Sequence, residues 1–248
     1  MFEIETKNLT KSFGSLVAVN NLNLQIRQGT IFGFLGPNGA GKSTTVKMLT
    51  GLLRPTAGEA LISGLSILNS ALEVKKKFGV LPEDLALFDS LTIWEHLMMC
   101  GPIYGLDRSE TAKRAAQLLK YLDLGNSRNV YVDQASSGMR KKCSLAMALL
   151  HNPAVLFLDE PFEGIDPVSS RNIKDLLLLL AGRGATIFLT SHILEVVERL
   201  VESFAIIVAG EIVCSQTVAE TLRAGQTIED LFLKHVRSDE VEQLEWIG

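Results

Sequence analysis

The segment IFGFLGPNGAGKST, Ile31–Thr44, carries the most informative pattern in this 248-residue chain. Its apolar start, Ile31–Leu35, predicts a fully buried strand. Gly36–Ser43 then follows the pattern Gly-x-x-x-x-Gly-Lys-Ser, and Lys42–Leu52 predicts a helix that closes near Gly51. A buried strand, a glycine-rich loop and a helix in this order indicate the core of an α/β fold.

The loop itself has the chemistry of a phosphate-binding loop, or P-loop. Glycines let the backbone curl until several N–H groups face one point, and such a nest holds phosphate oxygens. The helix that begins at Lys42 directs its positive end at the same anion. Lys42 adds a full charge near the β- and γ-phosphates, and the Ser43 hydroxyl is placed to bind Mg²⁺. The predicted phosphate-binding residues are Gly36, Pro37, Asn38, Gly39, Ala40, Gly41, Lys42, Ser43 and Thr44.

A second acidic site follows a later apolar strand, Ala154–Leu158, which ends in Asp159 and Glu160 before Pro161. A carboxylate at the end of a central parallel strand lies at the crevice where such sheets bind ligands. We expect Asp159 to hold Mg²⁺ through its water shell, as in other P-loop enzymes. We expect Glu160 to orient the attacking water and to accept its proton.

Strands and helices alternate before and after these motifs, which predicts a mainly parallel sheet covered on both faces. The period-two pattern of Leu22, Leu24 and Ile26 predicts a half-buried strand upstream of the loop. The other predicted strands are Glu59–Ile62, Phe78–Leu81, Ala185–Leu189 and Phe204–Val208, and the other predicted helices are Val168–Ala181, Ile193–Leu200, Thr217–Arg223 and Thr227–Val236.

The middle of the chain, from about Leu91 to Leu150, has helical spacing and predicts a helical insertion between two strand-rich portions. Ser109 is the predicted N-cap of one helix there, and Ser136 or Ser137 is the predicted N-cap of the next. The apolar face of the first helix is predicted to be Ala112, Ala115, Ala116, Leu119 and Leu122.

With these motifs in this order, the chain resembles the ATPase subunits of ATP-binding-cassette (ABC) transporters over roughly residues 1–235. Its general sequence pattern is most similar to that of single-cassette subunits that serve export-type permeases. The five-residue signature of that family, usually Leu-Ser-Gly-Gly-Gln, corresponds here to Ala135-Ser136-Ser137-Gly138-Met139. Ser136 and Gly138 match the pattern, and the other three residues depart from it. The resemblance implies that Ser136, Ser137 and Gly138 bind the γ-phosphate of ATP held by a second subunit.

Two further segments resemble family motifs downstream of the acidic strand. Glu163–Pro167, EGIDP, is similar to the D-loop, which links the two sites of a dimer, although serine is more usual at the position of Glu163. His192 resembles the switch histidine that contacts the γ-phosphate and takes part in catalysis.

Three single residues complete the resemblance. Phe13 resembles the aromatic residue that stacks on adenine, and Val19 the residue beneath the sugar and base. Glu83 fills a place where the family usually has glutamine, and its carboxylate can bind Mg²⁺ or a water. Because its charge lies close to phosphate, Glu83 can also weaken binding or retune coupling.

The resemblance implies a P-loop NTPase core with a mixed, mainly parallel sheet, an N-terminal antiparallel β portion and a helical insertion subdomain. We expect one ABC ATPase domain over residues 1–236. Its core comprises residues 1–90 and 152–216, its helical subdomain residues 91–151 and its C-terminal helices residues 217–236. Residues 237–248 form a short acidic tail.

The implied function is ATP binding and hydrolysis that powers an ABC transporter, an exporter, by ATP-dependent dimerisation. The expected cofactors are ATP and Mg²⁺, and the expected partners are a second cassette and an integral-membrane permease. The permease would hold the chain on the cytoplasmic face of the cell membrane. Two alternatives stay open: a degenerate regulatory cassette that binds ATP without useful turnover, and a non-transport ABC ATPase that acts in translation or DNA maintenance.

Composition limits the classes of partner that we expect for this chain. The net charge of −4 argues against a nucleic-acid partner, and the basic runs Lys75–Lys77 and Arg140–Lys142 are expected to be solvated faces. The cysteines show no zinc or redox spacing, and Cys143 and Cys214 are expected in the core. Every apolar run is far shorter than the ~20 residues of a membrane helix, so we expect a soluble chain without direct membrane insertion.

Overall fold

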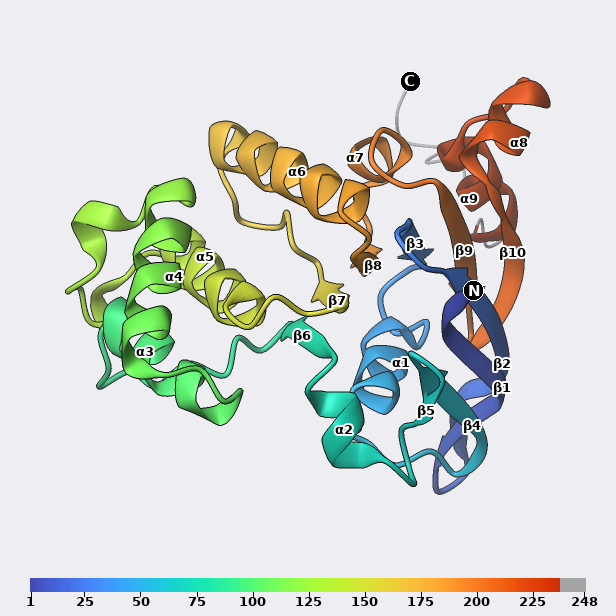
Figure 1. Ribbon diagram of the computed structural model, residues 1–248. Helices are drawn as coiled ribbons and strands as arrows, with labels where there is room; N and C mark the ends of the chain where they lie inside the picture. The colour runs from blue at the N-terminus through green and yellow to red at the C-terminus, as the bar shows by residue number, and fades with distance from the viewer. Residues whose placement is uncertain (237–248) are drawn as a thin grey trace, which may run out of the picture.

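The computed structural model describes residues 1–236, and the predicted acidic tail, residues 237–248, lies outside the described residues. A six-stranded sheet has the order β10-β9-β3-β8-β7-β6, in which β10 alone runs antiparallel to its neighbour (Figure 1). This confirms the predicted mixed, mainly parallel sheet. Its strands are β3 (Ile31–Leu35), β6 (Phe78–Leu81), β7 (Val155–Asp159), β8 (Thr186–Ser191), β9 (Ser203–Val208) and β10 (Glu211–Thr217).

An antiparallel sheet forms the N-terminal portion, in the order β2-β1-β4-β5. Its strands are β1 (Phe2–Phe13), β2 (Leu16–Arg27), β4 (Ala57–Ile62) and β5 (Leu65–Ser66). The first strand is absent from the residue-by-residue prediction, because its alternation is interrupted. Asn8 has a positive φ of 49°, and the pairing of β1 with β2 shifts register between Thr6 and Leu9. Such a bulge moves the following side chains to the other face and hides the period of two.

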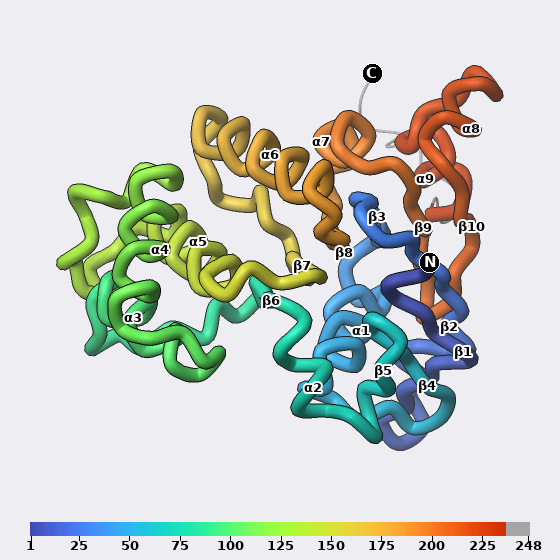
Figure 2. Tube along the Cα trace, in the orientation of Figure 1, coloured from blue at the N-terminus to red at the C-terminus, as the bar shows by residue number. Residues whose placement is uncertain are grey.

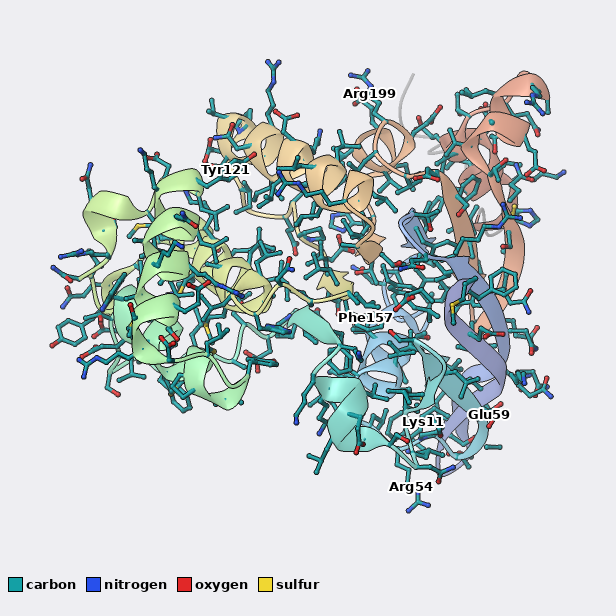
Figure 3. The ribbon with its side chains drawn as sticks, viewed as in Figure 1. Lys11, Arg54, Glu59, Tyr121, Phe157 and Arg199 are labelled. Atoms are coloured by element: carbon teal, nitrogen blue, oxygen red, sulfur yellow. The ribbon has the colours of Figure 1, made fainter. Side chains whose placement is uncertain are left out.

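The central strands are buried on both faces, which explains their continuous apolar runs. Phe34, Phe157 and Phe188 pack together on one face, and Phe157 lies in the interior whereas Arg199 points outward (Figure 3). Helix α1 (Lys42–Leu49) contributes Val46, Met48 and Leu49 to this cluster, which also contains buried residues of the antiparallel sheet. The P-loop helix is therefore fixed between the two sheets.

Helices cover the other face and one end. Between β6 and β7 the chain forms α3 (Ile93–Ile103), α4 (Arg108–Tyr121) and α5 (Ser137–Leu149), the predicted helical insertion. These three helices form a lobe at the end of the molecule opposite the antiparallel sheet (Figures 1 and 2). The remaining helices are α2 (Ala71–Lys75), α6 (Pro167–Gly182), α7 (Leu194–Glu198), α8 (Val218–Arg223) and α9 (Ile228–Val236). Within residues 1–236, no helix combines the length and apolar content needed to cross a bilayer.

Two local predictions are wrong. Asp107, not Ser109, is the N-cap of α4, since its side chain accepts a hydrogen bond from the backbone N–H of Glu110 at 2.8 Å. Ser109 lies inside the first turn. Cys214 on β10 is only partly buried, whereas Cys143 is buried as predicted and Cys100 joins it. The N-cap of α5 is Ser136, one of the two predicted residues.

Candidate functional site

The P-loop connects β3 to α1, and two of its glycines touch neighbouring backbone too closely for any side chain. A Cβ on Gly36 would lie 2.4 Å from the carbonyl oxygen of Ile207 on β9. A Cβ on Gly41 would lie 2.6 Å from the carbonyl oxygen of Ala18 on β2, and Gly41 has a positive φ of 108°. The loop is therefore seated against both sheets, and only glycine fits at these positions.

Lys42 and Ser43, the first residues of α1, present the two polar groups of the motif. The Lys42 side chain is only 7% exposed, and its Nζ donates hydrogen bonds to the carbonyl oxygens of Gly36 at 2.7 Å and Pro37 at 3.2 Å. Its charge thus lies across the mouth of the loop. The Ser43 hydroxyl donates a hydrogen bond to Oε2 of Glu83 at 3.1 Å. The structure therefore brings the Glu83 carboxylate next to the Ser43 hydroxyl, and its role as a magnesium ligand stays a prediction.

Asp159 ends β7 and is buried at 3% exposure. Its Oδ1 accepts a hydrogen bond from the Thr190 hydroxyl on β8, which lies opposite it in the strand register. Burial is the largest influence and raises the pKa of Asp159. The hydrogen bond from Thr190 and the nearby Ser43 hydroxyl lower this pKa, and the charges of Glu83 and Glu160 raise it further. Because burial and the neighbouring negative charges destabilise the ionised carboxylate, a cation beside it would be stabilising.

Glu160 occupies a strained turn directly after the strand. Its φ is +48°, in the left-handed region that residues other than glycine seldom adopt. Its backbone N–H donates to the Thr190 hydroxyl at 3.1 Å. Its carboxylate oxygen Oε2 lies 3.0 Å from Nδ1 of His192 and accepts the His192 backbone N–H at 3.3 Å. Two groups of His192 therefore hold the carboxylate, and the predicted catalytic pair is in contact.

A cavity of about 370 Å³ joins the two motifs. It brings together the P-loop, Glu83, Glu160 and His192 from distant parts of the sequence. Its lining residues are Ala18, Asn38, Gly39, Gly41, Lys42, Ser43, Thr44, Glu83, Glu160, Glu163 and His192. Sequence reasoning missed Ala18, and it missed Thr190 beside the cavity. Thr190 had a usable signal, because it lies near the carboxyl end of the strand adjacent to Asp159.

Phe13 and Val19, the two residues predicted to contact the adenine base and the sugar, differ in their exposure to solvent. Phe13 is 49% exposed at the end of β1, with Nζ of Lys11 5.0 Å from its ring centroid, so it is available for stacking. Val19 is completely buried, and its Cγ2 lies 3.2 Å from the position of a Cβ on Gly41. Ala18, the residue before it, lines the cavity, whereas Val19 packs against the P-loop at Gly41, and its contact with a nucleotide stays a prediction.

The signature segment lies apart from this cavity, whose lining includes none of Ser136, Ser137 and Gly138. Ser136 caps α5 by accepting the backbone N–H of Met139 at 3.3 Å, and the Ser136 and Ser137 side chains are exposed. A Cβ on Gly138 would lie 3.6 Å from the carbonyl oxygen of Gly164 in the D-loop. The segment is therefore an open helix N-terminus that borders the D-loop.

The basic run that follows this segment is not a solvated face, and that prediction is wrong for Arg140–Lys142. Nε of Arg140 donates to the carbonyl oxygen of Val132 at 2.8 Å, and Lys142 is buried at 8% exposure. Lys141 reaches the D-loop turn, and burial lowers its pKa. All three side chains thus hold the start of α5 to its surroundings.

Mg²⁺ is the metal that the predicted function requires, and the oxygen donors at this site suit it. The Ser43 hydroxyl and the carboxylates of Glu83 and Asp159 form a connected set beside the P-loop. Among residues 1–236 no cluster of three or more His, Cys, Asp or Glu side chains could hold a metal ion. Mg²⁺ usually takes one or two carboxylates together with substrate phosphates and water.

Comparisons with known proteins point to one family. The family model described as "ABC transporter" matches residues 19–163. The linearmycin resistance ATP-binding protein LnrL of Bacillus subtilis is 35% identical over 245 residues, which cover 95% of this chain and 79% of LnrL. The bacitracin transport ATP-binding protein BcrA of Bacillus licheniformis is 38% identical over 210 residues, which cover 84% of this chain and 68% of BcrA.

Solved structures agree with this assignment. An ATP-binding subunit of an ABC transporter superposes with a TM-score of 0.88 at 28% identity, over 94% of this chain and 99% of that subunit. A dimeric ATP-binding cassette in a post-hydrolysis state with ADP and phosphate superposes with a TM-score of 0.80 at 27% identity, over 87% of this chain and 98% of that cassette. The chain therefore belongs to the ABC transporter family, as one of its ATP-binding and ATP-hydrolysing proteins.

Proposed function

We propose that this chain powers an exporter as one of two cassettes that close over ATP and open when it is hydrolysed. The observation that carries the proposal is the cavity in which Lys42, Ser43, Glu83, Glu160 and His192 converge. The names of LnrL and BcrA refer to antibiotic resistance and antibiotic transport, which supports an export role.

The proposed binding mode follows the chemistry of the cavity. The P-loop amides and Lys42 take the β- and γ-phosphates, and Phe13 stacks on the adenine. Ser43, Glu83 and Asp159 hold Mg²⁺, which neutralises phosphate charge when bound. Glu160 accepts the proton of the attacking water, and His192 keeps its carboxylate directed at the γ-phosphate.

The second half of each site comes from the partner cassette in this proposal. The exposed Ser136 and Ser137 and the open amides at the start of α5 offer anion donors. They lie outside the cavity of their own chain, which is the arrangement expected if they serve ATP on a partner. The dimeric cassette with ADP and phosphate among the similar structures supports such a pair. ATP would then favour the closed pair by binding it better than the open one.

The proposal also includes a membrane partner. We propose that residues 1–236 form one ATPase domain whose helical lobe, residues 91–151, carries the closing motion to an integral-membrane permease. That permease would place the chain on the inner face of the cell membrane and would carry the transported substrate.

Two variants test the proposal. Replacing Lys42 with Ala should weaken ATP binding by about 100-fold, since two or more charge-assisted hydrogen bonds are worth about 3 kcal/mol. Lys47→Ala on the exposed side of the same helix is the matched control and should bind ATP as the wild type does. Isothermal titration with ATP and Mg²⁺ measures both. Unchanged affinity of the Lys42→Ala variant would contradict the proposal.

Glu160→Gln keeps the shape of the side chain and removes the base, so turnover should fall by about 10²- to 10⁴-fold while ATP still binds. Light scattering after gel filtration should then show a dimer with ATP and Mg²⁺ and a monomer without them. Wild-type turnover by this variant would show that Glu160 is not the base.

One observation favours a second candidate, a cassette that binds ATP with little turnover. Glu83 places a carboxylate 3.1 Å from the Ser43 hydroxyl, where its charge opposes the phosphates. An ATPase assay on the assembled transporter separates the two, because the regulatory cassette would show no turnover above that of its Glu160→Gln variant.

A further inference from the structure

Lys141 links two parts of its own chain. One is α5, which begins at the signature segment and is called the signature helix below. The other is the turn of residues 160–164, called the catalytic turn because it carries Glu160. Nζ of Lys141 donates hydrogen bonds to the carbonyl oxygen of Glu160 at 2.8 Å and to the carbonyl oxygen of Glu163 at 2.6 Å. The ammonium thus bridges both ends of the turn that carries the base. Lys141 belongs to α5, one turn after Ser137, so these bonds cross between elements that are distant in sequence.

The turn that Lys141 bridges needs external support. Glu160 has a φ of +48°, and a non-glycine residue held there costs about 1–3 kcal/mol and persists only where its surroundings fix it. Inside the turn, the backbone N–H of Glu163 reaches the Glu160 carbonyl at 3.3 Å, which is a long bond. The two shorter bonds from Lys141 are therefore the stronger restraint on this backbone.

Glu160 is held by residues from two parts of the chain, the end of β8 and helix α5. The Thr190 hydroxyl on β8 accepts its N–H, and His192 after β8 holds its carboxylate. Lys141 holds its carbonyl, and it comes from the helical lobe. The orientation of the carboxylate therefore depends on the lobe as well as on the sheet.

We propose that Lys141 is a positioning residue for ATP hydrolysis, which fixes the catalytic turn to the signature helix so that the Glu160 carboxylate is aimed correctly only when that helix is in place. The inference rests on the proposed role of Glu160 as the base. It predicts a link within one chain: movement of the signature segment reaches the base through Lys141. Lys141 acts through Glu160 and touches no substrate.

Charge and burial support a structural linkage rather than a solvent contact. Lys141 is partly buried beside the acidic groups Asp159, Glu160 and Glu163. Ser137 and Gly138, which precede Lys141 in the first turn of α5, border Gly164 of the same turn. The first turn of α5 and the 160–164 turn are thus in continuous contact, and Lys141 supplies its charged hydrogen bonds.

The test compares three variants in the full chain. Lys141→Met keeps the aliphatic stem and removes the ammonium, Lys141→Arg keeps a donor, and Lys113→Met on exposed α4 is the matched control. Lys141→Met should lower kcat by about 10- to 100-fold, the usual cost of a small misplacement of a catalytic group, and leave KM for ATP within about twofold. Lys141→Arg should recover most of the rate, and Lys113→Met should match the wild type.

A double-mutant cycle separates positioning from general damage. In a Glu160→Gln background, Lys141→Met should change the residual turnover by less than about twofold, because residues that act as one unit are not additive. A further tenfold loss in that background would overturn the proposal. So would a wild-type kcat for Lys141→Met, or a kcat of Lys141→Arg that is as low as that of Lys141→Met.

Hydrogen exchange tests the contact without ATP. Amides of residues 160–164 should exchange at least about fivefold faster in Lys141→Met than in the wild type, while those of residues 36–46 keep their rates. Unchanged exchange in residues 160–164 would overturn the tether. A wild-type chain without ATPase activity would instead contradict the proposed function, and the exchange result would still decide whether Lys141 holds the turn.

Discussion

The P-loop and the signature segment are both proposed to bind phosphate through glycines and a helix N-terminus, but they are built in opposite ways. Gly36 and Gly41 lie against the backbone of other strands, where a side chain cannot fit. Gly138 has only ordinary contacts, the nearest at 3.6 Å, and the serines before it are exposed. The P-loop, residues 36–44, is therefore enclosed by strands of its own chain, and we call it the socket. The signature segment is an open surface whose ligand, in the proposed pair, arrives with another chain.

The largest expected effect comes from adding one methyl group to the socket. Gly36→Ala places a Cβ 2.4 Å from the Ile207 carbonyl oxygen, so β3 and β9 must shift. The free energy of unfolding should fall by about 3 kcal/mol and ATP binding should be lost. Urea denaturation and titration calorimetry measure the two effects. Gly182→Ala on α6, where the space is open, is the control and should be neutral or slightly stabilising.

The same methyl group in the open surface should behave differently. Gly138→Ala has room and lies within a helix, so the free energy of unfolding should not fall, and ATP binding to the monomer should be unchanged. ATP-driven dimerisation and turnover should fall by about tenfold or more, because the Cβ covers amides meant for phosphate. Light scattering and an ATPase assay check this. If Gly138→Ala loses stability as Gly36→Ala does, the contrast between socket and surface is false.

Glu83 offers a smaller effect at the edge of the socket. Glu83→Gln removes one negative charge next to Ser43, so metal-free ATP should bind more tightly by about fivefold, or about 1 kcal/mol. With Mg²⁺ present the gain should shrink or reverse, because the same change replaces a charged carboxylate ligand with a weaker, neutral amide oxygen. Asp84→Asn, one residue away and outside the cavity lining, is the control. An equal gain with and without Mg²⁺ would show that Glu83 does not take part in metal binding.

The smallest effect lies just beyond the far end of the signature helix. His151 stacks on Tyr104 with ring centroids 3.6 Å apart, and burial lowers its pKa below the ordinary 6.5. Because the unfolded chain takes up the proton more readily, this contribution to stability is complete above pH 6.5 and is lost as pH falls below it. His151→Phe should keep the stack and reduce the loss of stability between pH 7 and 5.

Urea denaturation at several pH values measures this difference, which is at most about 1.4 kcal/mol per pH unit, the limit for one proton. Other groups titrate in the same range, so the difference in slope between wild type and variant is the quantity of interest. Identical slopes would mean that His151 takes up its proton equally well in the folded and unfolded chain.

Sequence patterns predicted the socket well because its chemistry is local. A buried run, a glycine spacing and a lysine sit side by side in the chain, and β3, β6 and α1 begin where expected. Prediction failed where a backbone irregularity interrupts the pattern. The bulge at Asn8 concealed β1, and the turn at Gly105 lets α4 start at once, so Asp107 rather than Ser109 became its cap.

The site shows the same division. Glu160 and His192 were predicted separately, and only folding makes them neighbours at 3.0 Å. Val19 could not be told from Ala18, because adjacent residues of a strand face opposite sides and the register decides which one lines the cavity. Lys141 was read as a surface charge, since nothing near it in sequence shows that the turn at Glu160 lies within its reach.

Helix α5 is a short rod that is attached near both of its ends. It is about 20 Å long, with Lys141 fastened past the end of β7 near its start and the His151 ring 3.1 Å from the carbonyl oxygen of Phe78 on β6 just beyond its end. Since β6 and β7 are neighbours in the sheet, the rod cannot tilt without straining that edge. We therefore expect a force on the start of α5 to be passed to β6 and β7 at this edge of the sheet.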